Sequence, residues 1–96
     1  MSDQKEALHA TIRGRVQGVG FRYFVRENAE MLGVTGWVRN KFDGTVETVA
    51  EGQRERLEQF LGLVKQGPRG SVVESIEHEF QDAGGEFNAF TIRLTK

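Results

Sequence analysis

The chain of 96 residues contains no cysteine and one proline, and none of its apolar runs is long enough to cross a membrane. Without cysteine there is neither a disulfide framework nor thiolate chemistry. A spanning helix needs about 18 consecutive apolar residues, and the polar N-terminal segment lacks the apolar stretch of a signal peptide. These absences exclude disulfide-stabilised and membrane-spanning proteins, and we expect a cytoplasmic protein.

The chain also lacks a strong excess of either charge. Its formal net charge is −1, which argues against a general nucleic-acid-binding protein. The charges are unevenly distributed, because residues 13–41 have six basic and two acidic residues and residues 42–96 have six basic and ten acidic ones. A locally positive field concentrates small anions. The basic segment is therefore the place to expect an anion site.

Glycine is abundant, and three glycines fall in residues 14–22, which read Gly-Arg-Val-Gln-Gly-Val-Gly-Phe-Arg. Glycine tolerates positive φ and lets the backbone approach a ligand closely. Because a helical pattern follows, the loop is expected to point several N–H groups at an anion, with the helix dipole behind them. Arg15 and Arg22 bracket it with two cations. The segment predicts a cradle for a phosphoryl group. The alternative is a plain tight turn. The segment matches neither the Walker pattern nor the dinucleotide-binding pattern.

The hydropathy pattern predicts the element order β-α-β-β-α-β, followed by a short closing strand. Strands are expected at residues 8–13, 34–40, 45–51, 72–80 and 89–95. Helical spacing starts at about residue 22 and ends at Gly33, and a second apolar stripe ends before Gly67-Pro68. Asp43-Gly44 predicts a hairpin turn. Residues 1–6 are expected to be a flexible tail.

Each predicted helix has one apolar stripe, so both helices should cover the same face of one sheet. Right-handed crossovers then favour a single ferredoxin-like α+β sandwich over residues 1–96, with a mainly antiparallel sheet in the order 4-1-3-2. The first two strands then end at one edge, which brings Asn40 to the glycine-rich loop. The last strand pairs either with the fourth strand or, after a crossing, with the second. We favour the crossing because residues 81–88 span roughly 25 Å when extended.

Two sequence blocks resemble the signatures of the acylphosphatase family. Residues 12–22, Ile-Arg-Gly-Arg-Val-Gln-Gly-Val-Gly-Phe-Arg, resemble that family's phosphate loop and its arginine. The second block is Gly-Trp-Val-Arg-Asn at residues 36–40, followed by Gly-Thr-Val at residues 44–46 and by Gly52. The likeness extends over about residues 8–94 and favours a free-standing enzyme.

The resemblance implies hydrolysis of the carboxyl–phosphate bond of an acyl phosphate, which releases a carboxylate and inorganic phosphate. It also implies that Arg22 binds the phosphoryl oxygens, that Asn40 positions the attacking water, and that no metal or cofactor takes part. The rest of the phosphate cradle is then the loop of Arg15, Val16, Gln17, Gly18, Val19 and Gly20. A carboxylate leaving group has a pKa of about 4, so no general acid need protonate it.

The alternative function is a non-catalytic ferredoxin-like module that binds RNA or an anion. RNA-recognition sheets stack bases on aromatic residues of their first and third strands, and residues 8–13 and 45–51 contain none. A second alternative is an acyl-phosphate- or carbamoyl-phosphate-handling domain of a larger maturation protein. We expect a monomer that binds an acyl phosphate substrate and inorganic phosphate, but no nucleic acid or membrane. The contributions of Gln17, Trp37 and His78 to the site stay open.

Overall fold

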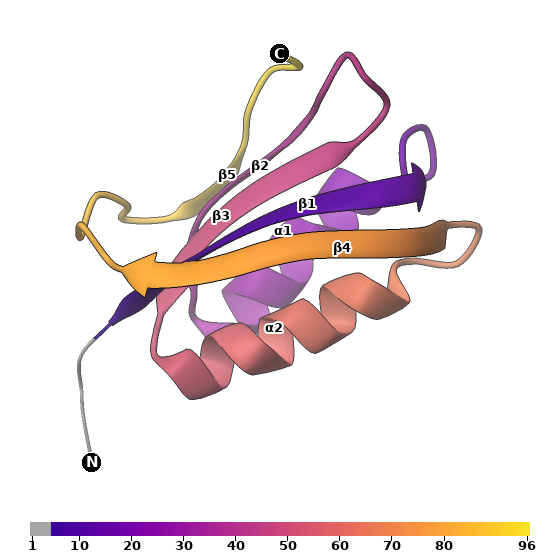
Figure 1. Cartoon of the computed structure of the whole chain (residues 1–96). Coiled ribbons are helices and arrows are strands. Elements are labelled where there is room, and N and C mark those ends of the chain that lie inside the picture. Colours follow the sequence, from indigo (N-terminus) through magenta and orange to yellow (C-terminus); the bar gives the residue numbers. More distant parts are fainter. Residues whose placement is uncertain (1–4) are drawn as a thin grey trace.

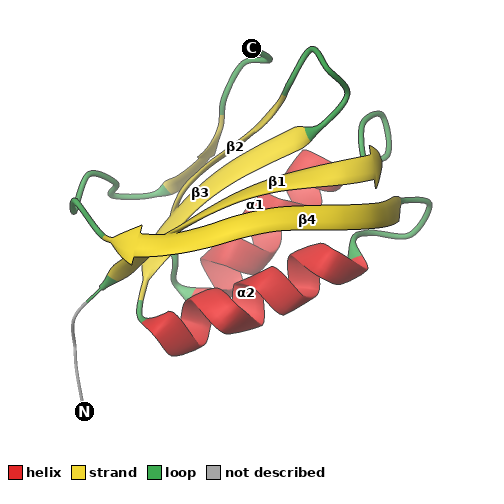
Figure 2. Ribbon diagram, in the orientation of Figure 1, coloured by secondary structure: helices red, strands yellow, loops and turns green. Residues whose placement is uncertain are grey.

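The computed structural model describes residues 5–96. Its elements in chain order are β1 (Glu6–Arg15), α1 (Phe21–Leu32), β2 (Thr35–Asn40), β3 (Val46–Gly52), α2 (Arg54–Gln66), β4 (Val72–Asp82) and β5 (Phe90–Ile92). The strands form one sheet in the order β4-β1-β3-β2-β5, and both helices lie on the same face of it (Figures 1 and 2). This is the ferredoxin-like α+β fold that the sequence predicts.

The sheet places the ends of β1 and β2 at the same edge. Both strands pair antiparallel with β3, which lies between them, so β1 and β2 run in the same direction. Val46 of β3 is the register partner of Ile12 on one side and of Asn40 on the other. The strand-to-helix loop that follows β1 therefore lies near the end of β2, as Figure 1 shows.

Between β4 and β5 the chain crosses from one edge of the sheet to the other. β5 pairs in parallel with β2, with Trp37 opposite Thr91, and so confirms the predicted crossing. The prediction for the N-terminal tail was too long, because Glu6 already belongs to β1 and pairs with both Gly52 and Asp82. Lys5 is exposed and precedes β1, and residues 1–4 lie outside the described part of the chain.

The core fills the space between the sheet and the two helices. Strand residues of one parity and one stripe of each helix supply it, as the alternation and the helical spacing predict. Its fully buried members include Leu8, Ile12, Phe21, Val25, Val38, Leu57, Phe60 and Val64. Burying each of these side chains contributes roughly 1.5–3 kcal/mol. This packing is what fixes the start of α1 against the ends of the strands.

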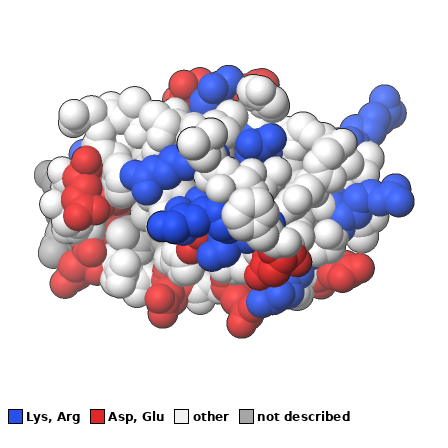
Figure 3. All heavy atoms as spheres, turned by 90° about the horizontal axis from the view of Figure 1, so that it is seen from above, with Lys and Arg blue, Asp and Glu red and all other residues white. Residues whose placement is uncertain are grey.

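Within residues 5–96 no helix covers the other face of the sheet, which carries an ionic and aromatic cluster. Trp37 is only 7% exposed because the guanidinium groups of Arg39 and Arg93 each lie 4.7 Å from its ring centroid. The view from above shows basic side chains gathered near the middle and acidic ones mainly toward the rim (Figure 3). Trp37 is therefore a covered residue of this face and not an open platform for a ligand.

Gly14 lies inside β1, where the pairing with β4 shifts register between Arg13 and Gly14. Its φ is 133°, and a Cβ atom at this position would collide with the carbonyl oxygen of Val72. Gly14 is thus required for the close approach of β1 and β4, whereas the other two glycines of the motif, Gly18 and Gly20, lie in the loop proper.

We expect Gly14→Ala to lower the free energy of unfolding by about 2 kcal/mol or more, because it adds both a collision and a strained φ. Gly62→Ala is the matched control, because Gly62 is an exposed helical residue with no atom within 4 Å of an added Cβ. That variant should gain about 0.5–1 kcal/mol. Urea denaturation of both variants measures the difference, and equal effects would contradict the packing role of Gly14.

Candidate active site

The loop between β1 and α1 is open on its outer side. Gly18 and Gly20 both have a φ of 75°, in the left-handed region that favours glycine. A Cβ atom on either residue would meet no other atom within 4 Å. Glycine is therefore needed here for the backbone conformation, and that conformation leaves space for a ligand to approach the main chain.

The same loop carries backbone N–H groups without protein acceptors. Within residues 5–96, no hydrogen-bond acceptor is present for the N–H groups of Gln17, Gly18, Val19 and Gly20. Gly20 is the N-cap of α1, and neither a side-chain cap nor an acidic residue in the first turn neutralises this helix end. Unpaired N–H groups at a helix N-terminus carry partial positive charge and suit an anion.

The side chains of the loop hold it in place. Val16 is 1% exposed and belongs to the core, and Val19 packs partly against the core. Arg15 is exposed at the end of β1. The valines thus anchor the loop from below, which leaves its main chain and Arg15 to face outward.

Gln17 connects the loop to the turn between β2 and β3. Its Nε2 donates to the carbonyl oxygens of Lys41 at 2.8 Å and Thr45 at 2.9 Å. Lys41 directly follows Asn40, the last residue of β2. The side chain of Gln17 therefore fastens the loop to the strand end that carries Asn40.

The turn itself is braced by Asp43. The Asp43 carboxylate accepts hydrogen bonds from the Thr45 hydroxyl at 2.7 Å and the Thr45 N–H at 3.0 Å. The hydroxyl bond, followed by the backbone bond, holds the pKa of Asp43 below its usual value. The predicted Asp43-Gly44 turn is confirmed, and it gives Gln17 two fixed acceptors.

Asn40 points into the interior at this edge of the sheet. Its side-chain oxygen, Oδ1, is buried and has no hydrogen-bond partner among the described residues. Buried polar atoms in folded proteins are nearly always paired, so such an atom calls for a functional explanation.

Arg22 is the second residue of α1 and is half-buried. Among residues 5–96 it forms no ion pair, whereas Arg13 pairs with Glu77 and Arg39 with Glu47. The basic segment found in the sequence is thus divided: part of it is neutralised by carboxylates on the open face of the sheet, and Arg22 has no acidic partner among the described residues.

The residues on either side of Asn40 are held by one carboxylate. Glu47 of β3 lies 2.8 Å from Arg39 and 3.8 Å from Lys41, and its second oxygen lies 2.7 Å from His9. Burial raises the pKa of Glu47, but the hydrogen bonds from His9 and Arg39 outweigh it and hold the pKa below the usual value. Local sequence patterns gave no signal for this cluster, because its members come from three strands and from the turn after β2.

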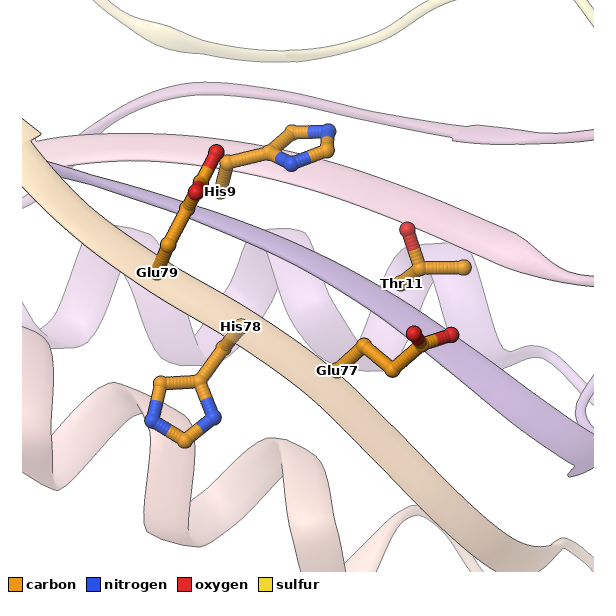
Figure 4. Close-up of a pocket in the computed structure, with 5 residues that line it drawn as sticks. All are labelled: His9, Thr11, Glu77, His78 and Glu79. Atoms are coloured by element: carbon orange, nitrogen blue, oxygen red, sulfur yellow. The ribbon is translucent and has the colours of Figure 1, made fainter.

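A hollow in the surface lies away from the loop, along β1 and β4 (Figure 4). Its lining residues are His9, Thr11, Glu77, His78 and Glu79. Figure 4 shows His78 pointing away from His9, toward the helices. Within residues 5–96 no three His, Cys, Asp or Glu side chains are grouped so that they could hold a metal ion. His78 therefore lies apart from the glycine loop and Asn40.

The fold and this loop define a ferredoxin-like protein. Among the described residues, its glycine-rich strand-to-helix loop has amides without acceptors and is followed by an arginine without an acidic partner. A profile of the family described as Acylphosphatase matches residues 8–92. The chain belongs to the acylphosphatase family, and it is accordingly an enzyme that hydrolyses acyl phosphates. In the part of the chain that the structure describes, no helix has the length and apolar character needed to cross a membrane.

Individual relatives support this membership. The acylphosphatase of Salinibacter ruber is 46% identical over 89 residues, which are 93% of this chain and 94% of that protein. The crystal structure of acylphosphatase from Bacillus subtilis has a TM-score of 0.89 and 39% identity, and covers 92% of this chain and 98% of that chain. Full-length HypF, in its phosphate- and nucleotide-bound form, matches with a TM-score of 0.88 and 30% identity over 99% of this chain but 13% of that chain.

The cluster around Glu47 predicts a specific response to acid. Because the folded-state pKa of Glu47 is below its ordinary value of 4.5, the carboxylate stabilises the fold above that pH, and this stability is lost as the pH falls through the folded-state pKa. We expect Glu47→Gln to be less stable than the wild type at neutral pH and to lose less stability on acidification. Urea denaturation across the acid range measures both. Glu58→Gln, at an exposed position, is the control. The assignment would be contradicted if the free energy of unfolding of Glu47→Gln fell with decreasing pH as steeply as that of the wild type.

Proposed function

We propose that the chain hydrolyses the carboxyl–phosphate bond with the phosphoryl group held by Arg22 and the amides of residues 15–20, and with the attacking water held by Asn40. One observation carries this proposal: the buried, unpartnered Oδ1 of Asn40 lies at the strand end that Gln17 fastens to the open glycine loop. Among the described residues, a hydrogen-bond acceptor without a partner thus lies at the same edge of the sheet as a group of donors without partners.

The donors suit a phosphoryl group. The backbone N–H groups of the loop are fixed dipoles that need no reorganisation when charge builds up on the phosphoryl oxygens. Arg22 adds a planar fork of donors and a full positive charge, which match two oxygens of a phosphate better than a single ammonium would. Because phosphoryl transfer relies on positioning and charge stabilisation, a cradle of this kind supplies most of what the reaction needs.

The acceptor suits a water molecule. Oδ1 of Asn40 accepts a hydrogen bond from the water, which turns a lone pair of the water oxygen toward phosphorus. The asparagine is neutral, so it does not repel the phosphoryl dianion as a carboxylate would. An aspartate at this position would add a negative charge and lose the amide donors.

In this reaction every bond that breaks is matched by a bond that forms, and no further reagent is needed. The water oxygen forms a bond to phosphorus while the bond between phosphorus and the acyl oxygen breaks, and that electron pair leaves with the carboxylate. The water proton passes to a phosphoryl oxygen, which yields inorganic phosphate. Because the leaving carboxylate is a weak base, its departure needs no proton.

We expect Arg22→Lys to weaken the competition by inorganic phosphate and to lower kcat/KM by about 10- to 100-fold, although the charge is kept. Hydrogen bonds to a charged group contribute about 1.5–3 kcal/mol, and one ammonium replaces only part of the fork. The assay is phosphate release from acetyl phosphate. Arg26→Lys, one turn further along α1, is the control and should stay close to wild type. Unchanged kinetics in Arg22→Lys would refute the cradle.

Asn40→Ala separates chemistry from binding. We expect kcat to fall by about 100-fold or more, with the dissociation constant of inorganic phosphate within about threefold of wild type, because Asn40 acts only on the water. Calorimetric phosphate titration, turnover and a melting curve are compared for the wild type, Asn40→Ala and the exposed-residue control Asn88→Ala. If turnover persists, Asn40 does not hold the water; if phosphate affinity and Tm fall together with turnover, its role is structural.

A further inference from the structure

The two halves of the proposed site belong to different parts of the chain. The loop amides and Arg22 follow β1, whereas Asn40 ends β2, and β3 separates these strands in the sheet. Neighbouring strands lie about 4.8 Å apart, so the two strand ends are roughly 10 Å from each other. The distance between a bound phosphorus atom and a water on Asn40 therefore depends on how loop and strand end are held together.

Backbone pairing alone does not fix this distance. The ladder of β1 with β3 ends at Ile12, and residues 16–20 lie outside every strand and helix. Among the described residues these N–H groups donate to no protein acceptor, and the first bond of α1 runs from the Phe24 N–H to the Gly20 carbonyl oxygen. The loop is thus held by the packing of its valines and by whatever its polar side chains contact.

Gln17 is the side chain that spans the gap. Its Nε2 uses both of its donors on the carbonyl oxygens of Lys41 and Thr45, at 2.8 and 2.9 Å. These two carbonyls stand at the first and last positions of the turn and are themselves fixed, since Lys41 N–H donates to Thr45 and Gly44 N–H donates to Lys41. With both donors occupied, the amide nitrogen is not available to bind the phosphoryl group.

We propose that Gln17 is a positioning residue that sets the separation between the phosphoryl group and the water on Asn40. This inference rests on the proposed function, and it assigns to the Gln17 side chain a task distinct from that of the loop amides. Reaction rates depend steeply on the alignment of the reacting atoms, and a displacement of about 1 Å costs about 100-fold in rate. Loss of the tether should therefore affect turnover far more than phosphate binding.

The test is Gln17→Met, which keeps the length and volume of the side chain and removes both donors. We expect kcat on acetyl phosphate to fall by about 10- to 100-fold, while the dissociation constant of inorganic phosphate stays within about threefold. Gln59→Met, an exposed position on α2, is the matched control. Gln17→Asn, which keeps the amide but is one methylene too short to reach both carbonyls, serves as a second variant and should show the same pattern.

The outcomes separate three roles of Gln17. A loss of phosphate affinity that equals the loss of kcat would mean that Gln17 binds the ligand, and a parallel loss of both with a fall in Tm would mean that it only supports the fold. Either result overturns the proposal, as does wild-type turnover in both variants. Failure of the proposed function itself is recognised separately, because Arg22→Lys or Asn40→Ala would then keep wild-type turnover, whatever the Gln17 variants do.

A double-variant cycle gives an independent readout. If Gln17 acts by aligning the water on Asn40, then Gln17→Met should lower kcat little further once Asn40 is alanine, because the aligned water is already lost. Multiplicative effects of the two changes on kcat would show that Gln17 acts independently of Asn40, and would overturn the proposal.

Discussion

The insertion of β3 between β1 and β2 is the constraint on which the rest of this protein depends. Antiparallel pairing on both sides of β3 forces β1 and β2 to run in the same direction and to end at the same edge. α1 must then start at that edge, because it follows β1 after five residues of loop. Strand order therefore brings the loop amides, Arg22 and Asn40 to one edge of the sheet, and the hydrogen bonds of Gln17 to Lys41 and Thr45 connect the loop to the end of β2.

Much of this was predictable from the sequence because it depends on local patterns. Alternation and helical spacing gave the element order, and the length of residues 81–88 favoured the crossing of the last strand. Contacts between distant residues were not predictable in the same way. Nothing near Gln17 indicates that its side chain reaches Lys41, 24 residues away, and nothing near Glu6 shows that strands on both sides extend β1. The roles of Arg22 and Asn40 came from a family resemblance, and they stay predictions.

Neighbouring side chains of β2 point to opposite faces of the sheet and have different surroundings. Arg39 stacks on Trp37 and pairs with Glu47 on the face that no helix covers, while its neighbour Asn40 turns its oxygen into the interior. Alternation along a strand makes this division unavoidable, since consecutive side chains point to opposite faces. A charge count along the sequence therefore overstates the positive field at the loop, because part of that charge is neutralised on the opposite face.

The glycine loop also has a consequence for how the enzyme responds to its surroundings. Backbone amides and asparagine do not titrate, and arginine stays protonated at every pH at which proteins fold. A site built from these groups has no ionisation of its own near neutrality. Its pH dependence would follow the ionisation of the substrate's phosphoryl group and, in acid, the stability of the fold. Such an enzyme would keep a constant rate through changes in acidity that switch histidine-dependent enzymes on or off.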